Sequence, residues 1–216
     1  MQWPSLHEVS KKLAIPTGYS ISEIAEFDIS NLIENLKNWV PYLTVGSESE
    51  HLEANFYRDS VCLLDSSRDR DHYGILIKFN GELVGFCTFK KCSRSLTVES
   101  GLSAVSSKHR GHNLGNLIFE FWHEVSKLMH AETMIGIGTL QSIQAQLLAE
   151  KWNFKLVGII PGYDIGLNRQ GERKRVYEAF YIKHLVPDSA LELPSSENLT
   201  AQTKKLFEVL FGQPFS

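Results

Sequence analysis

The chain has 216 residues, of which 43% are hydrophobic and 22% charged, and its formal net charge at pH 7 is −3. This composition is that of one ordinary globular domain with short appendages, which excludes extensive disorder and fibrous repeats. No apolar run approaches the roughly 20 residues that cross a bilayer. The 22 basic residues are outnumbered by 25 acidic ones. We therefore expect binding neither to a membrane nor to nucleic acid.

The three cysteines, Cys62, Cys87 and Cys92, form no closely spaced pair, and their number is odd. This usage predicts free thiols in a reducing compartment rather than disulfides. The N-terminus lacks the charged-then-apolar order of a secretory signal, so we expect a cytoplasmic protein. His123 and His130 share one face of a predicted helix but lack a cysteine or acidic partner, and we therefore expect no metal site.

Residues 1–16 combine two prolines with scattered charges and predict an arm or short helix before the main domain. From Tyr19 the alternation of apolar and polar residues predicts a strand. Apolar residues at helical spacing then predict a helix that Asp28 or Ser30 caps and Pro41 limits. The remaining elements of this half are a helix at 47–57, a loop at 66–72 and a hairpin at 73–91 whose turn is Asn80-Gly81.

The second half of the chain alternates strands and helices. The segment 95–107 predicts a strand in which Gly101 marks a bulge or a close approach of another backbone. Apolar residues that recur at three and four predict a long amphipathic helix at 114–130. The later elements are a strand at 133–140, a helix at 142–152, a strand at 154–164 that Pro161-Gly162 ends, a loop at 165–174, a strand at 175–185 and a terminal helix. This order predicts an α/β fold with a mixed sheet and helices on its faces.

The segment from Val98 to Leu117 is a predicted strand, a short turn that contains Gly111 and Gly115, and the start of the long helix. Backbone N–H groups in such a turn and in the first helical turn lack acceptors within the chain, and the helix dipole favours an anion beside them. The segment therefore predicts a phosphate or pyrophosphate site. A purely structural strand–turn–helix is the alternative, because that arrangement is common.

Within this segment, Arg110-Gly111-His112-Asn113-Leu114-Gly115 resembles the signature Q/R-x-x-G-x-G/A of the GNAT superfamily of acyl-CoA-dependent N-acyltransferases. Asn113 stands where glycine is usual, and asparagine tolerates left-handed backbone angles. The resemblance spans about 18–186 and implies a mostly antiparallel sheet, loop amides that hold the CoA pyrophosphate, and a strand beside the pantetheine. The implied cofactor contacts are Ala104, Val105, Arg110, Gly111, His112, Asn113, Leu114, Gly115, Asn116 and Ser142.

The segment from Ser142 to Phe154 resembles a second family pattern, N-x-x-A-x-x-L-Y, with departures. Ser142 replaces the usual Asn, Asn153 replaces a Gly, and Ala149 stands where many members have the Tyr that protonates the departing thiolate. Another group, or water, must then supply that proton. The candidates near the final strands are Tyr163, Tyr177 and Tyr181.

Glu99 stands five residues before Ala104, as does the general base in the histone-acetyltransferase branch of the family. An amine is protonated at pH 7 and must lose a proton before it attacks a thioester, so a carboxylate near it has a role. The resemblance therefore implies that Glu99 is the base. The alternative is a solvated Glu on the outer face of an alternating strand.

The resemblance implies an N-acyltransferase, in the first instance an N-acetyltransferase, that uses acetyl-CoA or a longer acyl-CoA. A primary amine of a small molecule or peptide would attack directly in a ternary complex. Acidic residues of the predicted 47–57 helix permit a cationic acceptor: Glu48, Glu50 and Glu53.

The alternative is a non-catalytic acyl-CoA-binding module that regulates a protein partner. Its docking surface would be the C-terminal helix, which could instead pack on the core or on a second subunit in a homodimer. The expected organisation is an arm at 1–16, an acyltransferase domain at 17–186, and a linker with a terminal helix at 187–216.

Overall fold

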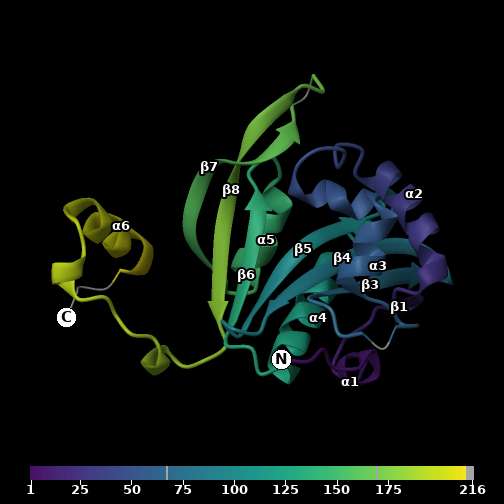
Figure 1. Cartoon of the computed structure of the whole chain (residues 1–216), viewed down its shortest axis with the longest axis horizontal. Helices are drawn as coiled ribbons and strands as arrows, with labels where there is room; N and C mark the ends of the chain where they lie inside the picture. Colours follow the sequence, from purple (N-terminus) through teal and green to yellow (C-terminus); the bar gives the residue numbers. More distant parts are fainter. Residues whose placement is uncertain (67, 169, 213–216) are drawn as a thin grey trace.

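The computed structural model describes residues 1–66, 68–168 and 170–212 (Figure 1). Its centre is an eight-stranded sheet in the order β1-β3-β4-β5-β6-β8-β7, with β2 paired to β3 outside this path. The pairs β5–β6 and β2–β3 are parallel and the other pairs are antiparallel, which confirms the expected α/β fold with a mixed, mostly antiparallel sheet. The strands are β1 (Tyr19–Glu23), β2 (Val61–Cys62), β3 (His72–Phe79), β4 (Glu82–Cys92), β5 (Thr97–Val105), β6 (Thr133–Thr139), β7 (Lys155–Leu167) and β8 (Arg173–His184).

Helices cover both faces of the sheet, as expected (Figure 1). On one face, Leu32 and Leu36 of α2 pack with the strand residues Leu76 and Phe86. On the other, apolar residues of α4 pack with the rest of the strand side chains, and the periodic positions of the predicted helix are the buried ones. The helices are α1 (Leu6–Ser10), α2 (Ile29–Trp39), α3 (Ala54–Ser60), α4 (Leu114–Leu128), α5 (Ile143–Lys151) and α6 (Ala201–Phe211); the short 3-10 helices are η1 (Glu26–Asp28), η2 (Ser47–Leu52), η3 (Ser107–His109), η4 (Asp188–Ala190) and η5 (Ser196–Asn198).

The predicted hairpin and the predicted bulge are confirmed. Asn80 and Gly81 both have positive φ, 50° and 89°, and they join β3 to β4 as a tight turn. In β5, two residues oppose Thr88 of β4, because Cys87 pairs with Ser103 whereas Phe89 pairs with Ser100. A Cβ atom on Gly101 would lie 2.6 Å from Thr88 Oγ1, so the bulge requires a residue without a side chain there.

Two sequence predictions are wrong. The single helix expected at 47–57 is a 3-10 helix, η2, followed by α3, because Glu53 between them is extended and the buried His51 turns into the core. Pro161-Gly162 does not end its strand: β7 continues to Leu167, and the pairing skips across this dipeptide. Proline lacks an N–H for the ladder, and an edge strand absorbs that loss as a bulge. The loop expected at 165–174 is correspondingly shorter.

The two ends of the chain differ in how they pack. Val9 of α1 is fully buried, and the Trp3 ring stacks on Tyr73 at 5.3 Å. Residues 1–16 therefore lie against the sheet. By contrast, α6 stands apart from the sheet in Figure 1 and buries none of its residues. In the described part of the chain, no helix is long and apolar enough to span a lipid bilayer.

Candidate functional site

The strands β5 and β6 pair only near their N-terminal ends. Thr97–Glu99 aligns with Thr133–Ile135, and beyond these residues β5 stays with β4 while β6 stays with β8. The two strands diverge in Figure 1. Parallel strands that separate leave backbone N–H and C=O groups facing the gap, and an extended ligand with amide groups can pair with them as an added strand.

The loop that follows β5 presents a row of free backbone donors. In the described residues, the structure provides no acceptor for the backbone N–H groups from Gly111 to Asn116. Asn113, the residue before α4, adopts a left-handed conformation, which asparagine tolerates, with φ 65° and ψ 11°. Free N–H groups that converge at a helix N-terminus form an anion site, so the geometry suits a phosphate or pyrophosphate here.

Side chains of the loop hold its shape. Arg110 folds back, and its Nε donates to the Val105 carbonyl at 3.2 Å and its Nη2 to the Trp39 carbonyl at 3.3 Å. The guanidinium thereby links the end of β5 to the C-terminal end of α2, where the helix dipole favours a positive charge. Beside it, Gly111 has a φ of 84°, and no atom lies within 4 Å of the position of a Cβ. The loop is therefore anchored on one side and open on the other.

The 3-10 helix η2 lies beside the β5 bulge, and its residue Glu48 places a carboxyl group next to Leu102 there. The side chain is 42% exposed overall, but its Oε2 atom is buried and accepts no hydrogen bond. Burial and the nearby carboxylates of Glu50, Asp164 and Glu178 raise its pKa to about 7, and a hydrogen bond from the Leu102 N–H opposes this shift. A carboxyl with this pKa gains and loses a proton near neutral pH.

Two carboxylates from the last strands complete the acidic side of the site. Asp164 accepts from the Ser47 backbone N at 3.0 Å and from the Ser47 hydroxyl at 2.9 Å, and so ties the start of η2 to β7. Glu178 on β8 is only 7% exposed, and burial followed by the charge of Asp164 raises its pKa to about 7. Segments more than 100 residues apart in the chain thereby create one negative region.

Comparisons with known proteins identify the architecture. No protein-family model matches the chain, and no curated protein matches it in sequence. Solved structures do match. An IAA acetyltransferase from Bacillus cereus has a TM-score of 0.55 at 16% identity, covering 77% of this chain and 99% of its own. A spermidine N-acetyltransferase from Vibrio cholerae has 0.58 at 12%, with coverage of 78% and 95%. A GNAT family acetyltransferase from Elizabethkingia anophelis with acetyl-CoA bound has 0.55 at 13%, with coverage of 79% and 100%.

The chain has the GNAT fold. At these identities the likeness establishes the fold alone.

The GNAT fold brings most of the predicted cofactor contacts to one place. The segment 110–116 forms the loop and the first turn of α4, directly after Ala104 and Val105 at the end of β5. Gly115 serves helix packing, because a Cβ atom there would lie 2.7 Å from Leu148 Cδ1 of α5. Asn116 accepts from the Trp152 indole at 3.3 Å, and the Ser142 hydroxyl caps α5 by accepting from the Gln144 N–H. The side chains of these residues thus hold the site together, while the loop backbone stays free.

The predicted catalytic residues do not lie together. Glu99 is the last residue of β5 that pairs with β6, and it stands between Lys90 of β4 and Ile135 of β6. Tyr163 lies in the β7 bulge and packs edge-on against Phe180 at 5.0 Å. Tyr177 neighbours Glu178 in β8, so alternation along the strand turns it to the opposite face. Phe180 is two residues after Glu178 and lies on the same face of β8, so Tyr163, which packs against Phe180, shares the face of Glu178.

Sequence reasoning missed the functional potential of Asp164 and Glu178, and it named Glu48 only as one of three acidic residues that permit a cationic acceptor, not as a base. What they share is proximity to one another, since Asp164 raises the pKa of both Glu48 and Glu178, and this proximity is a property of the folded chain. Glu178 does carry a local hint, since an acidic residue within the apolar strand run from Val176 to Ile182 is unusual.

Replacing Glu178 by Gln is expected to stabilise the protein at pH 8 and to change little at pH 4.5. The folded state holds a proton on Glu178 up to about pH 7 whereas the unfolded state releases it near 4.5, so the free energy of unfolding falls as pH rises between these values. Thermal melts from pH 4.5 to 8 measure the difference in Tm, with the exposed Glu82→Gln as control. A Tm difference that does not grow with pH would contradict the assigned shift.

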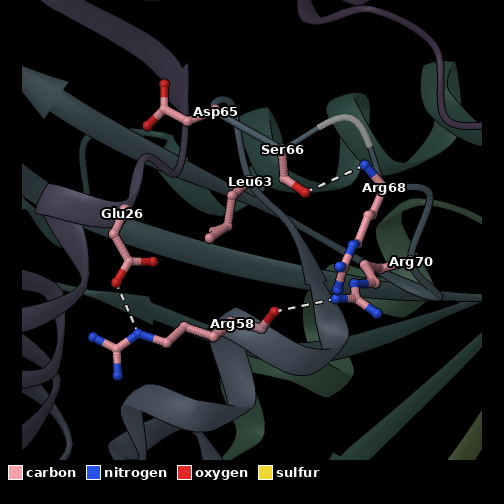
Figure 2. Close-up of a pocket in the computed structure, with 7 residues that line it drawn as sticks. All are labelled: Glu26, Arg58, Leu63, Asp65, Ser66, Arg68 and Arg70. Carbon is pink, nitrogen blue, oxygen red and sulfur yellow. Dashed lines mark hydrogen bonds and ion pairs between the residues drawn. The ribbon is translucent and has the colours of Figure 1, made fainter.

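A separate surface hollow borders η1, α3 and the loop after β2 (Figure 2). In it, Arg58 Nε donates to Glu26 Oε1 at 2.7 Å, and Arg70 Nη2 donates to the Arg58 carbonyl at 3.4 Å. The hollow lies beside β2 and β3, apart from the gap between β5 and β6. Among the described residues, no cluster of three or more His, Cys, Asp or Glu side chains is arranged to hold a metal ion.

Proposed function

We propose that the protein is an N-acyltransferase that moves the acyl group of acyl-CoA, in the first instance acetyl-CoA, to a primary amine of a small molecule or peptide. The observation that carries this proposal is the row of unpartnered N–H groups from Gly111 to Asn116 at the mouth of the β5–β6 gap. Such a row suits the CoA pyrophosphate, and the gap suits the amide-bearing pantetheine. A structure with the same fold holds acetyl-CoA.

The acidic side of the site supports a cationic amine as the acceptor. The carboxyls of Glu48, Asp164 and Glu178 attract an ammonium group to the β5 bulge. Buried carboxyls with pKa values of about 7 are stabilised when a cation lies beside them. The acceptors to test first are therefore diamines and lysine-containing peptides.

Glu48 is the proposed base. Its carboxyl lies at the Leu102 N–H of the bulge, beside the strand that would carry the thioester, and its pKa of about 7 matches neutral-pH proton transfer. Glu48 accepts a proton from the ammonium, directly or through water, and the amine nitrogen then attacks the thioester carbon. The new C–N bond forms as the C–S bond breaks. Backbone N–H groups in the 102–105 segment polarise the thioester oxygen.

The CoA thiolate leaves with the electron pair of the C–S bond and must take up a proton. Ala149 of α5 is 5% exposed and packs in the core, so no hydroxyl is available at that position. Tyr163 is the proposed donor, because it is 47% exposed on the face that carries Glu178. The nitrogen loses its second surplus proton as the amide forms, and this proton returns to the Tyr163 oxygen through water. Glu99 and Tyr177 remain predictions to be compared with Glu48 and Tyr163.

The test of this function is a calorimetric titration of the folded protein with CoA, acetyl-CoA and a longer acyl-CoA, followed by an amine screen. Thiol release and the mass of the acylated amine measure transfer. We expect binding of at least one acyl-CoA and transfer to a cationic amine. The absence of binding would contradict both the enzyme and the alternative regulatory module. Binding without transfer to any amine would favour the regulatory module.

A further inference from the structure

His51 is the penultimate residue of η2. It is buried, with 2% of its surface exposed, and both of its ring nitrogens have partners. Nδ1 lies 3.0 Å from the Glu48 backbone oxygen and Nε2 lies 3.0 Å from Thr88 Oγ1. A carbonyl oxygen only accepts, so Nδ1 carries the proton. Burial lowers the pKa of His51 to about 4, which keeps the ring neutral, and Nε2 therefore accepts from the Thr88 hydroxyl.

The same ring contacts the Glu48 carboxyl. Nδ1 lies 3.2 Å from Glu48 Oε2, the buried oxygen that accepts no hydrogen bond. On the other side of the ring, Thr88 Oγ1 lies against Gly101 in the β5 bulge. The chain Glu48–His51–Thr88 therefore links the proposed base to the strand segment that would hold the thioester.

We propose that His51 is a positioning residue for Glu48, which holds the Glu48 carboxyl beside the β5 bulge and favours its ionised form through the Nδ1–H dipole. This inference rests on the proposed function, in which Glu48 removes the proton of the amine. His51 itself transfers no proton, because it stays neutral and both of its nitrogens are engaged.

Most of the groups around the Glu48 carboxyl disfavour its ionised form, so a neutral hydrogen-bond donor close to it matters for its charge. Glu50 on η2, Asp164 on β7 and Glu178 on β8 all disfavour a negative charge on Glu48, as does burial. The Leu102 N–H favours the charge. Nδ1 of His51, whose N–H donates to the Glu48 backbone oxygen, lies 3.2 Å from Oε2 of the same residue and brings its partial positive charge close to the carboxyl. A charge on His72 would also oppose protonation of His51.

Aromatic rings hold the imidazole in place. The ring centroids of Phe56 and Phe86 lie 4.6 Å and 5.8 Å from that of His51, and the Tyr57 hydroxyl donates to the His51 carbonyl at 2.9 Å. A ring packed in this way loses little further freedom when it contacts Glu48. The packing also predicts that substitutions of His51 lower stability, so the test must separate that effect from the effect on Glu48.

Two amide variants make this separation. The amide nitrogen of His51→Asn lies near the Nδ1 position and can still approach Glu48, whereas the longer His51→Gln reaches the Nε2 position and the Thr88 side. Carbon-13 NMR titration of the carboxyl groups, with the Glu48 signal assigned through Glu48→Gln, measures the Glu48 pKa in each protein. We expect a rise of about one unit in His51→Gln and a much smaller change in His51→Asn.

A second measurement uses the unaltered protein. Long-range proton–nitrogen NMR spectra report which ring nitrogen of His51 carries the proton, and we expect Nδ1. An Nε2 proton, or equal Glu48 pKa changes in the two variants, would overturn the proposal and leave His51 a packing residue. The titration does not require turnover. A His51-dependent Glu48 pKa in a protein that transfers no acyl group would therefore contradict the proposed function alone.

Discussion

Glu48→Gln is expected to lower kcat/KM for acyl transfer by about 100- to 10,000-fold, the range over which a positioned general base acts. Glutamine keeps the size of the side chain and its contact with the Leu102 N–H, but it cannot accept the proton of the ammonium. The wild-type rate should fall below about pH 7, where Glu48 is protonated, and the variant should lose this dependence. Initial rates of thiol release from pH 6 to 9, with the best amine of the screen, measure both effects.

The matched control is Glu34→Gln, which removes one carboxylate from the exposed surface of α2. Its rates should equal those of the wild type. Glu99→Gln provides the competing assignment. If Glu99→Gln abolishes transfer while Glu48→Gln retains it, the base is Glu99, and the resemblance to the histone-acetyltransferase branch identified it correctly.

Gly111→Trp is expected to weaken CoA binding by about 100-fold or more, because the indole would occupy the space in front of the free N–H groups. Each charge-assisted hydrogen bond lost there is worth about 1.5–3 kcal/mol. No atom lies within 4 Å of a Cβ at this position, so the side chain can enter the proposed anion site without disturbing the core. Calorimetric titration with CoA measures the change in affinity.

The φ of 84° at Gly111 makes any side chain there costly, and a control must carry the same cost. Gly81→Trp does so, since Gly81 has a φ of 89° and equally open surroundings in the turn between β3 and β4. The control should bind CoA as the wild type does. Equal affinity in both variants would show that the loop at 111–116 does not hold the pyrophosphate.

Much of the fold follows from local signals. Asn80-Gly81 specifies a tight turn because both residues tolerate positive φ, and the hairpin forms around it. The spacing of apolar residues from Leu114 onward specifies the buried face of α4. Gly101 and Asn113 mark a bulge and a left-handed helix start, and both conformations depend mainly on the residue itself. These features also place the proposed anion site.

The mistaken elements depend on tertiary contacts. A continuous helix at 47–57 satisfies the local pattern, but it would not allow His51 to reach Thr88 in the sheet. The buried hydrogen bond between these two residues therefore favours the interrupted helix. Pro161-Gly162 is a dipeptide that, judged from its neighbours alone, should end the strand. It becomes a bulge because the pairing of β7 with β8 resumes at Asp164, after the dipeptide.

The sequence by itself determined the α/β order of elements, the hairpin, the long helix and the glycine-containing loop, since each depends on neighbouring residues. Only the tertiary structure decided the acidic side of the site. Glu48, Asp164 and Glu178 come from η2, β7 and β8, and their proximity depends on how the sheet and its connections fold. The pKa of a carboxyl depends on desolvation and on neighbouring charges, and both are set by residues that are distant along the chain.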